Sequence, residues 1–194
     1  MEEKLIRDAL MLWATIDPIG TLAIFDSVTA ALTPGQRRKT ALKATVYSAL
    51  ILLGSIVIGQ ILLSALGIDL LSLQVAGGAI LFLFALQMIF GSKMDEQGGD
   101  TSSQHDLAVF PLAVPSIASP GAIMAVIVLT DNNLHDIPEQ LATAGVLIGV
   151  LIVTCLLMLA STRILRVIGS NGAAILIRVM GLILAALSVQ LVFE

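Results

Sequence analysis

The sequence predicts an all-α polytopic membrane protein of six transmembrane helices, arranged as two inverted three-helix repeats. The first observation is composition: the 194-residue chain is 57% hydrophobic and only 12% charged, with a mean hydropathy of +1.00. Soluble domains carry about 25% charged residues, which cover their surface. The second observation is that the charges cluster between long apolar runs, and the third is that the two halves of the chain share motifs in the same order.

Six apolar runs are long enough to cross a bilayer, which takes about 20 residues at a rise of about 1.5 Å each. They cover residues 5–31, 41–66, 70–90, 107–130, 137–161 and 173–193. Residues 33–39 and 131–133 contain breakers or charges and are expected to be turns. Residues 67–69 and 169–172 are expected to be tight links that end helices. Residues 91–106 are expected to form one long polar loop.

The distribution of lysine and arginine predicts the orientation of the spans. The first, third and fifth loops hold or border most basic residues, whereas the second and fourth loops hold none. Cytoplasmic loops carry an excess of basic residues, so the odd loops are predicted to be cytoplasmic. A multi-pass protein of the cell (inner) membrane with both termini outside is therefore expected. The basic residues concerned are Arg37, Arg38, Lys39, Lys43, Lys93, Arg163 and Arg166.

The two halves match at a nearly constant offset. Asp17-Pro18 falls on Ser119-Pro120 and Gly67 falls on Gly169, each 102 residues further on. Because three spans is an odd number, the second repeat must enter the membrane from the opposite side, an architecture typical of secondary transporters. The predicted units are residues 1–91, a cytoplasmic loop at 92–106, and the inverted repeat at 107–194.

The first and fourth spans are both expected to be broken at mid-membrane. Each carries proline, which removes a backbone N–H, and glycine, which adds conformational freedom. Broken backbone in lipid is tolerated where it is buried in protein or lines a wet cavity, although proline can also simply kink a helix. The residues at the breaks, taken as candidate substrate-binding residues, are Asp17, Pro18, Ile19, Gly20, Thr21, Ser119, Pro120, Gly121 and Ala122.

The breaks suit a small zwitterion. Two half-helices would begin near Pro18 and Pro120, and their free N–H groups favour a carboxylate. Carbonyl groups freed just upstream favour an ammonium group or a cation. Asp17 is the most informative single residue, because an ionisable group at the bilayer centre costs about 2.5–3.5 kcal/mol. It is expected to bind the substrate amine or to carry a coupling proton, or to cap the following half-helix.

Other residues exclude several functions. A net charge of −4 spread over loops argues against nucleic acid, which needs a basic face. The spans hold no Ser/His pair, paired aspartates or His-Glu-x-x-His motif, so no enzyme is expected. No phosphate-binding loop is found in the sequence, and no cofactor is expected. No metal site is expected either, since His105 and His135 lie on separate loops. Gly77, Gly78 and the Gly145–Gly149 pair are interpreted as packing sites, compatible with a homo-oligomer.

Three segments resemble the MarC family of bacterial and archaeal inner-membrane proteins. They are residues 14–25, residues 67–82 and residues 111–123, in this order, so that the resemblance covers essentially the whole chain. It implies six spans and, for relatives of the SnatA type, proton-coupled transport of small neutral amino acids such as glycine and alanine. It also implies that the two breaks form the substrate site. The chain departs from the family pattern at Thr21, Ala23, Ser119 and Asp26.

We therefore expect a secondary transporter of small neutral amino acids, working by alternating access around the two breaks. Its expected partners are a neutral amino acid and the lipid bilayer. Two alternatives remain from the sequence. One is a transporter or efflux protein for another small solute, and the other is a channel or a non-transporting membrane scaffold in which the breaks serve packing alone.

Overall fold

The computed structural model describes residues 2–90, 106–132 and 134–193, and within these ranges the chain forms helices and turns without a strand. The predicted loop at 92–106 lies almost wholly outside the described residues. The all-helical prediction is confirmed. The elements are α1 (Glu2–Ile16), α2 (Pro18–Val28), α3 (Pro34–Leu66), α4 (Leu70–Phe90), η2 (Ala108–Ile117), α5 (Pro120–Leu129) and α6 (Ile137–Phe193).

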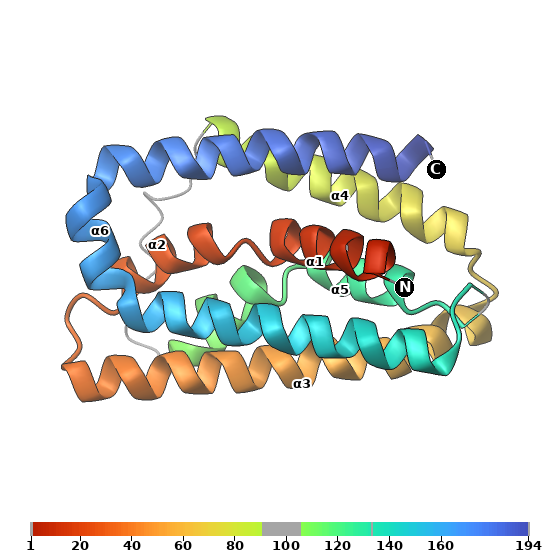
Figure 1. The fold of residues 1–194 in the computed structure, drawn as a ribbon, viewed down its shortest axis with the longest axis horizontal. Helices are drawn as coiled ribbons and strands as arrows, with labels where there is room; N and C mark the ends of the chain where they lie inside the picture. Colours follow the sequence, from red (N-terminus) through yellow and green to blue (C-terminus); the bar gives the residue numbers. More distant parts are fainter. Residues whose placement is uncertain (1, 91–105, 133, 194) are drawn as a thin grey trace.

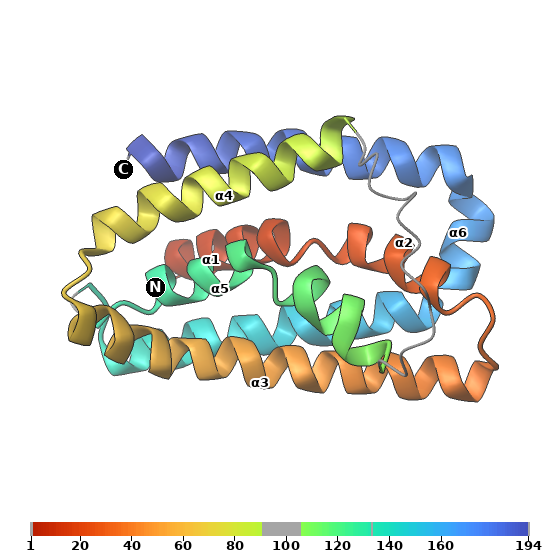
Figure 2. The same cartoon turned by 180° about the vertical axis from the view of Figure 1, so that it is seen from behind.

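The helices form three layers, with the two interrupted helices in the middle. Figures 1 and 2 show α1 and α2 end to end, beside η2 and α5, through the centre of the molecule. The long helix α3 and the first part of α6 lie on one side of this centre, and α4 and the last part of α6 lie on the other. Both termini lie at the same end of the molecule, opposite the bend of α6 (Figure 1).

Among the described residues, four helical stretches are long and apolar enough to cross a membrane, and a fifth is obtained if η2 and α5 count as one bent span. Helix α6 turns back on itself at Gly169, whose φ of 71° lies in the left-handed region that favours glycine. It thus contains one long candidate span, Ile137–Gly169, and one shorter apolar helix, Ala174–Gln190. Residues 169–172, predicted as a tight link between two helices, therefore lie at the bend that joins these two parts of α6.

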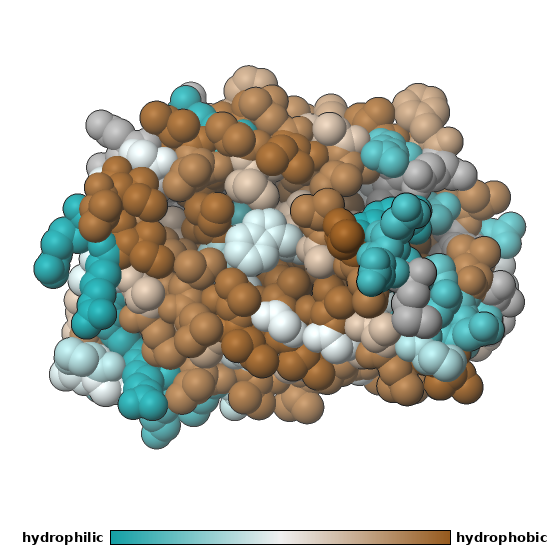
Figure 3. Space-filling view, viewed as in Figure 1, coloured by the Kyte–Doolittle hydropathy of each residue, from teal (hydrophilic) through white to brown (hydrophobic). Residues whose placement is uncertain are grey.

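The outer surface of the helices is apolar. Large hydrophobic side chains of α3, α4 and α6 are exposed, among them Leu50, Leu83 and Leu156. In Figure 3 the hydrophobic surface covers the middle of this face, while hydrophilic residues gather toward the two ends. Soluble proteins rarely expose apolar patches beyond a few hundred Å², so this belt fits a lipid environment.

The prediction of a turn at residues 33–39 is wrong, because α3 already begins at Pro34. Thr33 and Gln36 form a reciprocal cap: the Thr33 N–H donates to Gln36 Oε1 at 2.9 Å, and the Gln36 N–H donates to Thr33 Oγ1 at 3.4 Å. Proline is favoured as the first residue of a helix, where its missing N–H has no intrahelical role. The charged residues that follow form the first turns of α3.

Glycine allows α4 to pack closely in the core. A Cβ atom at Gly78 would lie 2.9 Å from the Ser188 carbonyl oxygen of α6, and one at Gly77 would lie 2.4 Å from the Met124 side chain of α5. The packing interpretation is confirmed for these two residues. Gly145 and Gly149 do not serve packing between helices of the same chain, because an added Cβ would meet nothing within 4 Å at either position.

Candidate functional site

The first break lies between α1 and α2, at a single residue. Asp17 adopts a left-handed conformation with φ 48° and ψ 70°, which ends α1 at Ile16 and lets α2 begin at Pro18. Its carboxylate accepts a hydrogen bond from the Gly20 N–H at 3.0 Å, so the predicted capping role is confirmed. A Cβ atom at Gly20 would lie 2.0 Å from Asp17 Oδ2, so only glycine leaves room for this carboxylate.

The second break lies between η2 and α5, whose axes differ by 54°. Phe110 and Val114, each followed by a proline, leave helical geometry within η2. Ser119 is extended, with φ −67° and ψ 157°, and its hydroxyl oxygen accepts a hydrogen bond from the Ala122 N–H at 3.0 Å. Both breaks therefore consist of a polar cap followed by proline as the first residue of the next helix.

The two breaks contact each other directly. The Ser119 hydroxyl donates to the Thr15 carbonyl oxygen at 3.1 Å, which satisfies one of the carbonyl groups freed at the end of α1. The hydroxyl groups of Thr21 and Ser116 lie 3.0 Å apart and share a hydrogen bond. All four residues are buried. The polar groups released by each break are thus bound in part by the other break, in the centre of the molecule.

The structure brings the predicted site residues together with one exception. Asp17, Pro18, Gly20, Thr21, Ser119, Gly121 and Ala122 are buried, and Ile19 is half-buried. Pro120 is exposed on the outside of α5. The N–H groups of Ile19 and Gly121, each second in its helix, have no acceptor within that helix. These two donors are the groups that each break offers to a bound anion.

Sequence reasoning missed two residues of this centre, Thr15 and Ser116. Thr15 accepts from the Ser119 hydroxyl through its backbone carbonyl oxygen, and the Ser116 hydroxyl shares a hydrogen bond with Thr21. A hydroxyl within a span is common and by itself signals nothing. The useful signal was position, since both residues lie within three positions of a residue that caps a half-helix.

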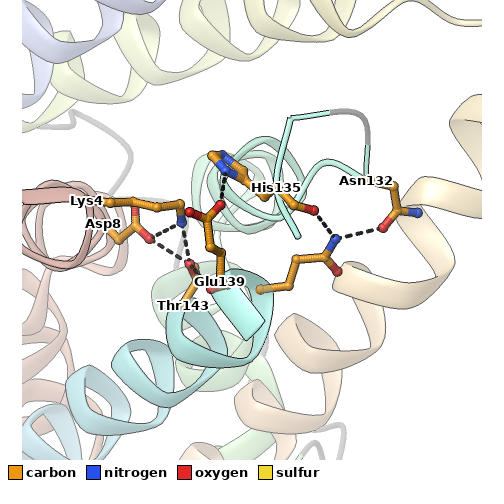
Figure 4. A network of polar contacts seen from close by, with 7 residues as sticks. Lys4, Asp8, Asn132, His135, Glu139 and Thr143 are labelled. Atoms are coloured by element: carbon orange, nitrogen blue, oxygen red, sulfur yellow. Dashed lines mark hydrogen bonds and ion pairs between the residues drawn. The ribbon is translucent and has the colours of Figure 1, made fainter. Parts of the chain in front are cut away.

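An ion pair with a hydroxyl partner lies on each side of the breaks. Lys4 donates to Asp8 Oδ2 at 2.8 Å, and the Thr143 hydroxyl donates to the same oxygen at 2.6 Å (Figure 4). These residues join α1 to the beginning of α6, at the end of the molecule that holds the termini. The Asp8 carboxylate is fully buried, so both bonds to it are shielded from water.

At the opposite end, Arg37 of α3 pairs with Asp26 of α2 and donates to the Ser161 hydroxyl of α6 at 2.9 Å. Its guanidinium also lies 5.4 Å from the centre of the Phe25 ring, within the range of a cation–π contact. Nearby, Lys43 donates to Asp106 at 2.7 Å and holds the pKa of that carboxyl below its usual range. The bundle is therefore closed by polar contacts at both ends.

Sequence comparison assigns the family. Residues 3–194 match the family described as MarC family integral membrane protein. A membrane protein of Buchnera aphidicola subsp. Schizaphis graminum is 31% identical over 98% of this chain and 95% of its own length, and one of Archaeoglobus fulgidus is 33% identical over 94% and 87%. The inner membrane protein YhgN of Escherichia coli K12 is 30% identical over 98% and 95%. No solved structure matches the chain. The chain belongs to the MarC family and is an integral inner-membrane protein.

Proposed function

We propose that this chain is a secondary transporter of small neutral amino acids, of the glycine and alanine type, coupled to protons. The observation that carries the proposal is the pair of helix breaks that meet in the buried centre. Interrupted helices in membrane proteins expose backbone donors and acceptors within the bilayer, where they can bind a polar solute. The chain is not an enzyme, and it needs no cofactor.

The chemistry of the breaks fits a zwitterion. The N–H groups of Ile19 and Gly121 begin the half-helices α2 and α5, where the helix dipole favours a carboxylate. The Asp17 carboxylate lies at the same break, 6% exposed, and suits the ammonium group of the solute or a transported proton. Alanine and glycine carry both charges and little else, so they match these donors and this carboxylate.

The six apolar segments form two inverted repeats in this proposal. The arrangement in Figure 1 supports it, because α1 with α2, α3 and α4 take places that resemble those of η2 with α5, the first part of α6 and the last part of α6. Each set comprises one interrupted helix in the centre and two helices outside. Rocking of one set against the other opens the breaks alternately to the two sides of the membrane.

Both termini face outside the cell. The support is the distribution of basic residues, since α3 begins with Arg37, Arg38 and Lys39 at the end of the molecule opposite the termini, and Arg163 and Arg166 precede the bend of α6 at that same end. The positive-inside rule places this end in the cytoplasm. Lys43 follows in the same part of α3, and Lys93 lies outside the described residues.

Uptake of radiolabelled glycine and alanine into liposomes of the purified protein tests the proposal. Saturable uptake that an inward proton gradient accelerates is expected, with empty liposomes as the control. Uptake that never saturates indicates a channel. The proposal is contradicted if the folded protein takes up neither amino acid and if neither amino acid changes its melting temperature. The protein would then transport another solute or serve as a membrane scaffold.

A further inference from the structure

A cavity separate from the breaks lies between α1, α4, α5 and the last part of α6. Its volume is about 200 Å³, and it lies at the end of the molecule that holds both termini (Figure 1). Four of its lining side chains are polar, namely Arg7, Gln74, His135 and Gln190, and the rest of its wall is aliphatic. A small number of polar groups in an apolar wall is typical of a site for a small molecule.

The acidic groups near this cavity already have partners. Asp8 accepts hydrogen bonds from Lys4 and Thr143, and Glu139 lies 3.1 Å from the His135 ring nitrogen Nδ1 (Figure 4). Both carboxylates are therefore already paired, although Asp8 Oδ1 is buried without a hydrogen-bond partner among the described residues.

Arg7 differs from these residues. Within the described part of the chain, its guanidinium has neither an ion pair nor a hydrogen bond, although it lines the cavity. A guanidinium offers five N–H donors in a planar fork that matches the two oxygens of a carboxylate. The cavity thus presents one unpaired cation beside an aliphatic wall.

We propose that this cavity is an outer binding site for a small solute that carries a carboxylate, and that Arg7 binds this carboxylate. The volume of about 200 Å³ is below the range of about 300–1,000 Å³ that drug-sized ligands need, so it selects a small molecule. The Gln74 side chain, on the opposite helix α4, presents an amide that can accept from an amino group.

The position of the cavity connects it to the breaks. Met11 forms part of its wall and precedes Asp17 by six residues, about 9 Å along the helix axis. The Thr15 hydroxyl donates to the Met11 carbonyl oxygen at 2.9 Å, and the Thr15 carbonyl oxygen accepts from Ser119. Arg7 itself precedes Asp17 by ten residues, about 15 Å along the helix axis, so a solute at Arg7 lies on the terminal side of the central site. The identification of this solute as the transported amino acid rests on the proposed function.

Equilibrium binding of labelled alanine to the purified full chain tests the site, with Arg7→Gln as the variant. Arg163→Gln, an exposed arginine at the other end of the molecule, is the matched control. We expect Arg7→Gln to weaken alanine binding by about tenfold or more, and the control to leave it unchanged. Alaninamide, which lacks the carboxylate, should bind the wild type as weakly as alanine binds Arg7→Gln. Gln74→Leu, which removes the amide that accepts from the amino group, should also weaken alanine binding.

Unchanged alanine affinity in Arg7→Gln overturns the inference, even if the protein transports alanine. A loss that appears in lipid nanodiscs with anionic lipid, and is absent in purely zwitterionic nanodiscs, also overturns it, because Arg7 then binds a lipid headgroup. If the wild type binds no amino acid, the proposed function fails, and acetate and lactate are tested in the same way. Binding of either one that Arg7→Gln weakens about tenfold supports the site, and binding of neither overturns it.

Discussion

Replacing Thr143 with valine should destabilise the protein through the buried Asp8 carboxylate. The Thr143 hydroxyl donates to Asp8 Oδ2 at 2.6 Å, the length of a hydrogen bond between a hydroxyl and an ionised carboxylate. The other oxygen, Asp8 Oδ1, is buried and has no hydrogen-bond partner within the described residues. Without Thr143, Lys4 is the one remaining partner of this carboxylate there.

The expected loss follows from the kind of bond that is removed. Neutral hydrogen bonds between membrane helices contribute about 0.6 kcal/mol on average and reach about 1.7 kcal/mol. Hydrogen bonds to charged groups contribute about 1.5–3 kcal/mol. Because this bond joins a hydroxyl to a fully buried carboxylate, we expect Thr143→Val to cost about 1.5–2 kcal/mol, near the overlap of the two ranges.

Thr154→Val is the matched control on the same helix. Thr154 is equally buried, but its hydroxyl donates at 2.8 Å to the Val150 carbonyl oxygen of its own helix, so its loss leaves no buried charge without a partner. We expect a change within about 0.5 kcal/mol for this control. Reversible unfolding by sodium dodecyl sulfate in mixed micelles measures both free energies.

The Asp8→Asn background separates the carboxylate from simple packing. There the cost of Thr143→Val should fall toward that of Thr154→Val, because the charge that the hydroxyl stabilises is gone. If Thr143→Val is no more destabilising than Thr154→Val in the wild-type background, the reasoning about the buried ion pair is wrong.

Two further predictions concern the breaks. Gly20→Ala should lower the free energy of unfolding by about 0.5–2 kcal/mol, because its Cβ would lie 2.0 Å from the Asp17 carboxylate that caps α2. Gly145→Ala is the control, because its added Cβ would meet nothing within 4 Å, and it should stabilise α6 by about 0.5–1 kcal/mol. Equal effects of the two changes in the same unfolding assay would argue against the close contact at Asp17. Ser119→Ala should cost about 1–3 kcal/mol, because it removes both the cap of α5 and the bond to the Thr15 carbonyl oxygen. A loss below about 0.5 kcal/mol would mean that the two breaks do not hold each other.

The positions of the breaks could be predicted from local chemistry. Proline is favoured at the first position of a helix and a short polar side chain just before it, so Asp17-Pro18 and Ser119-Pro120 each mark a helix start. The same rule, applied to Thr33-Pro34, would have predicted the start of α3. There the charged residues after the proline outweighed the capping pattern, and a turn was predicted instead.

Contacts between distant segments could not be predicted in this way. Ser119 bonds to Thr15, 104 residues earlier, and Asp8 bonds to Thr143, 135 residues later. Both pairs depend on which faces of two helices meet, and hydropathy along one helix does not contain that information. Asp8 stands among charged residues near the start of the sequence, yet it is fully buried and bonds to Thr143 of α6.

Movement of amino acids through the two breaks, with Asp17 as the charged group, is tested by Asp17→Asn in proteoliposomes. Asparagine can still accept the hydrogen bond from the Gly20 N–H, so the cap persists while the charge is lost. The measurement is the initial rate of labelled alanine uptake with and without an inward proton gradient. We expect saturable wild-type uptake that the gradient accelerates, and no acceleration in Asp17→Asn. Equal acceleration in both proteins would contradict the role of Asp17, and no uptake by folded wild-type protein would contradict the amino-acid transport itself.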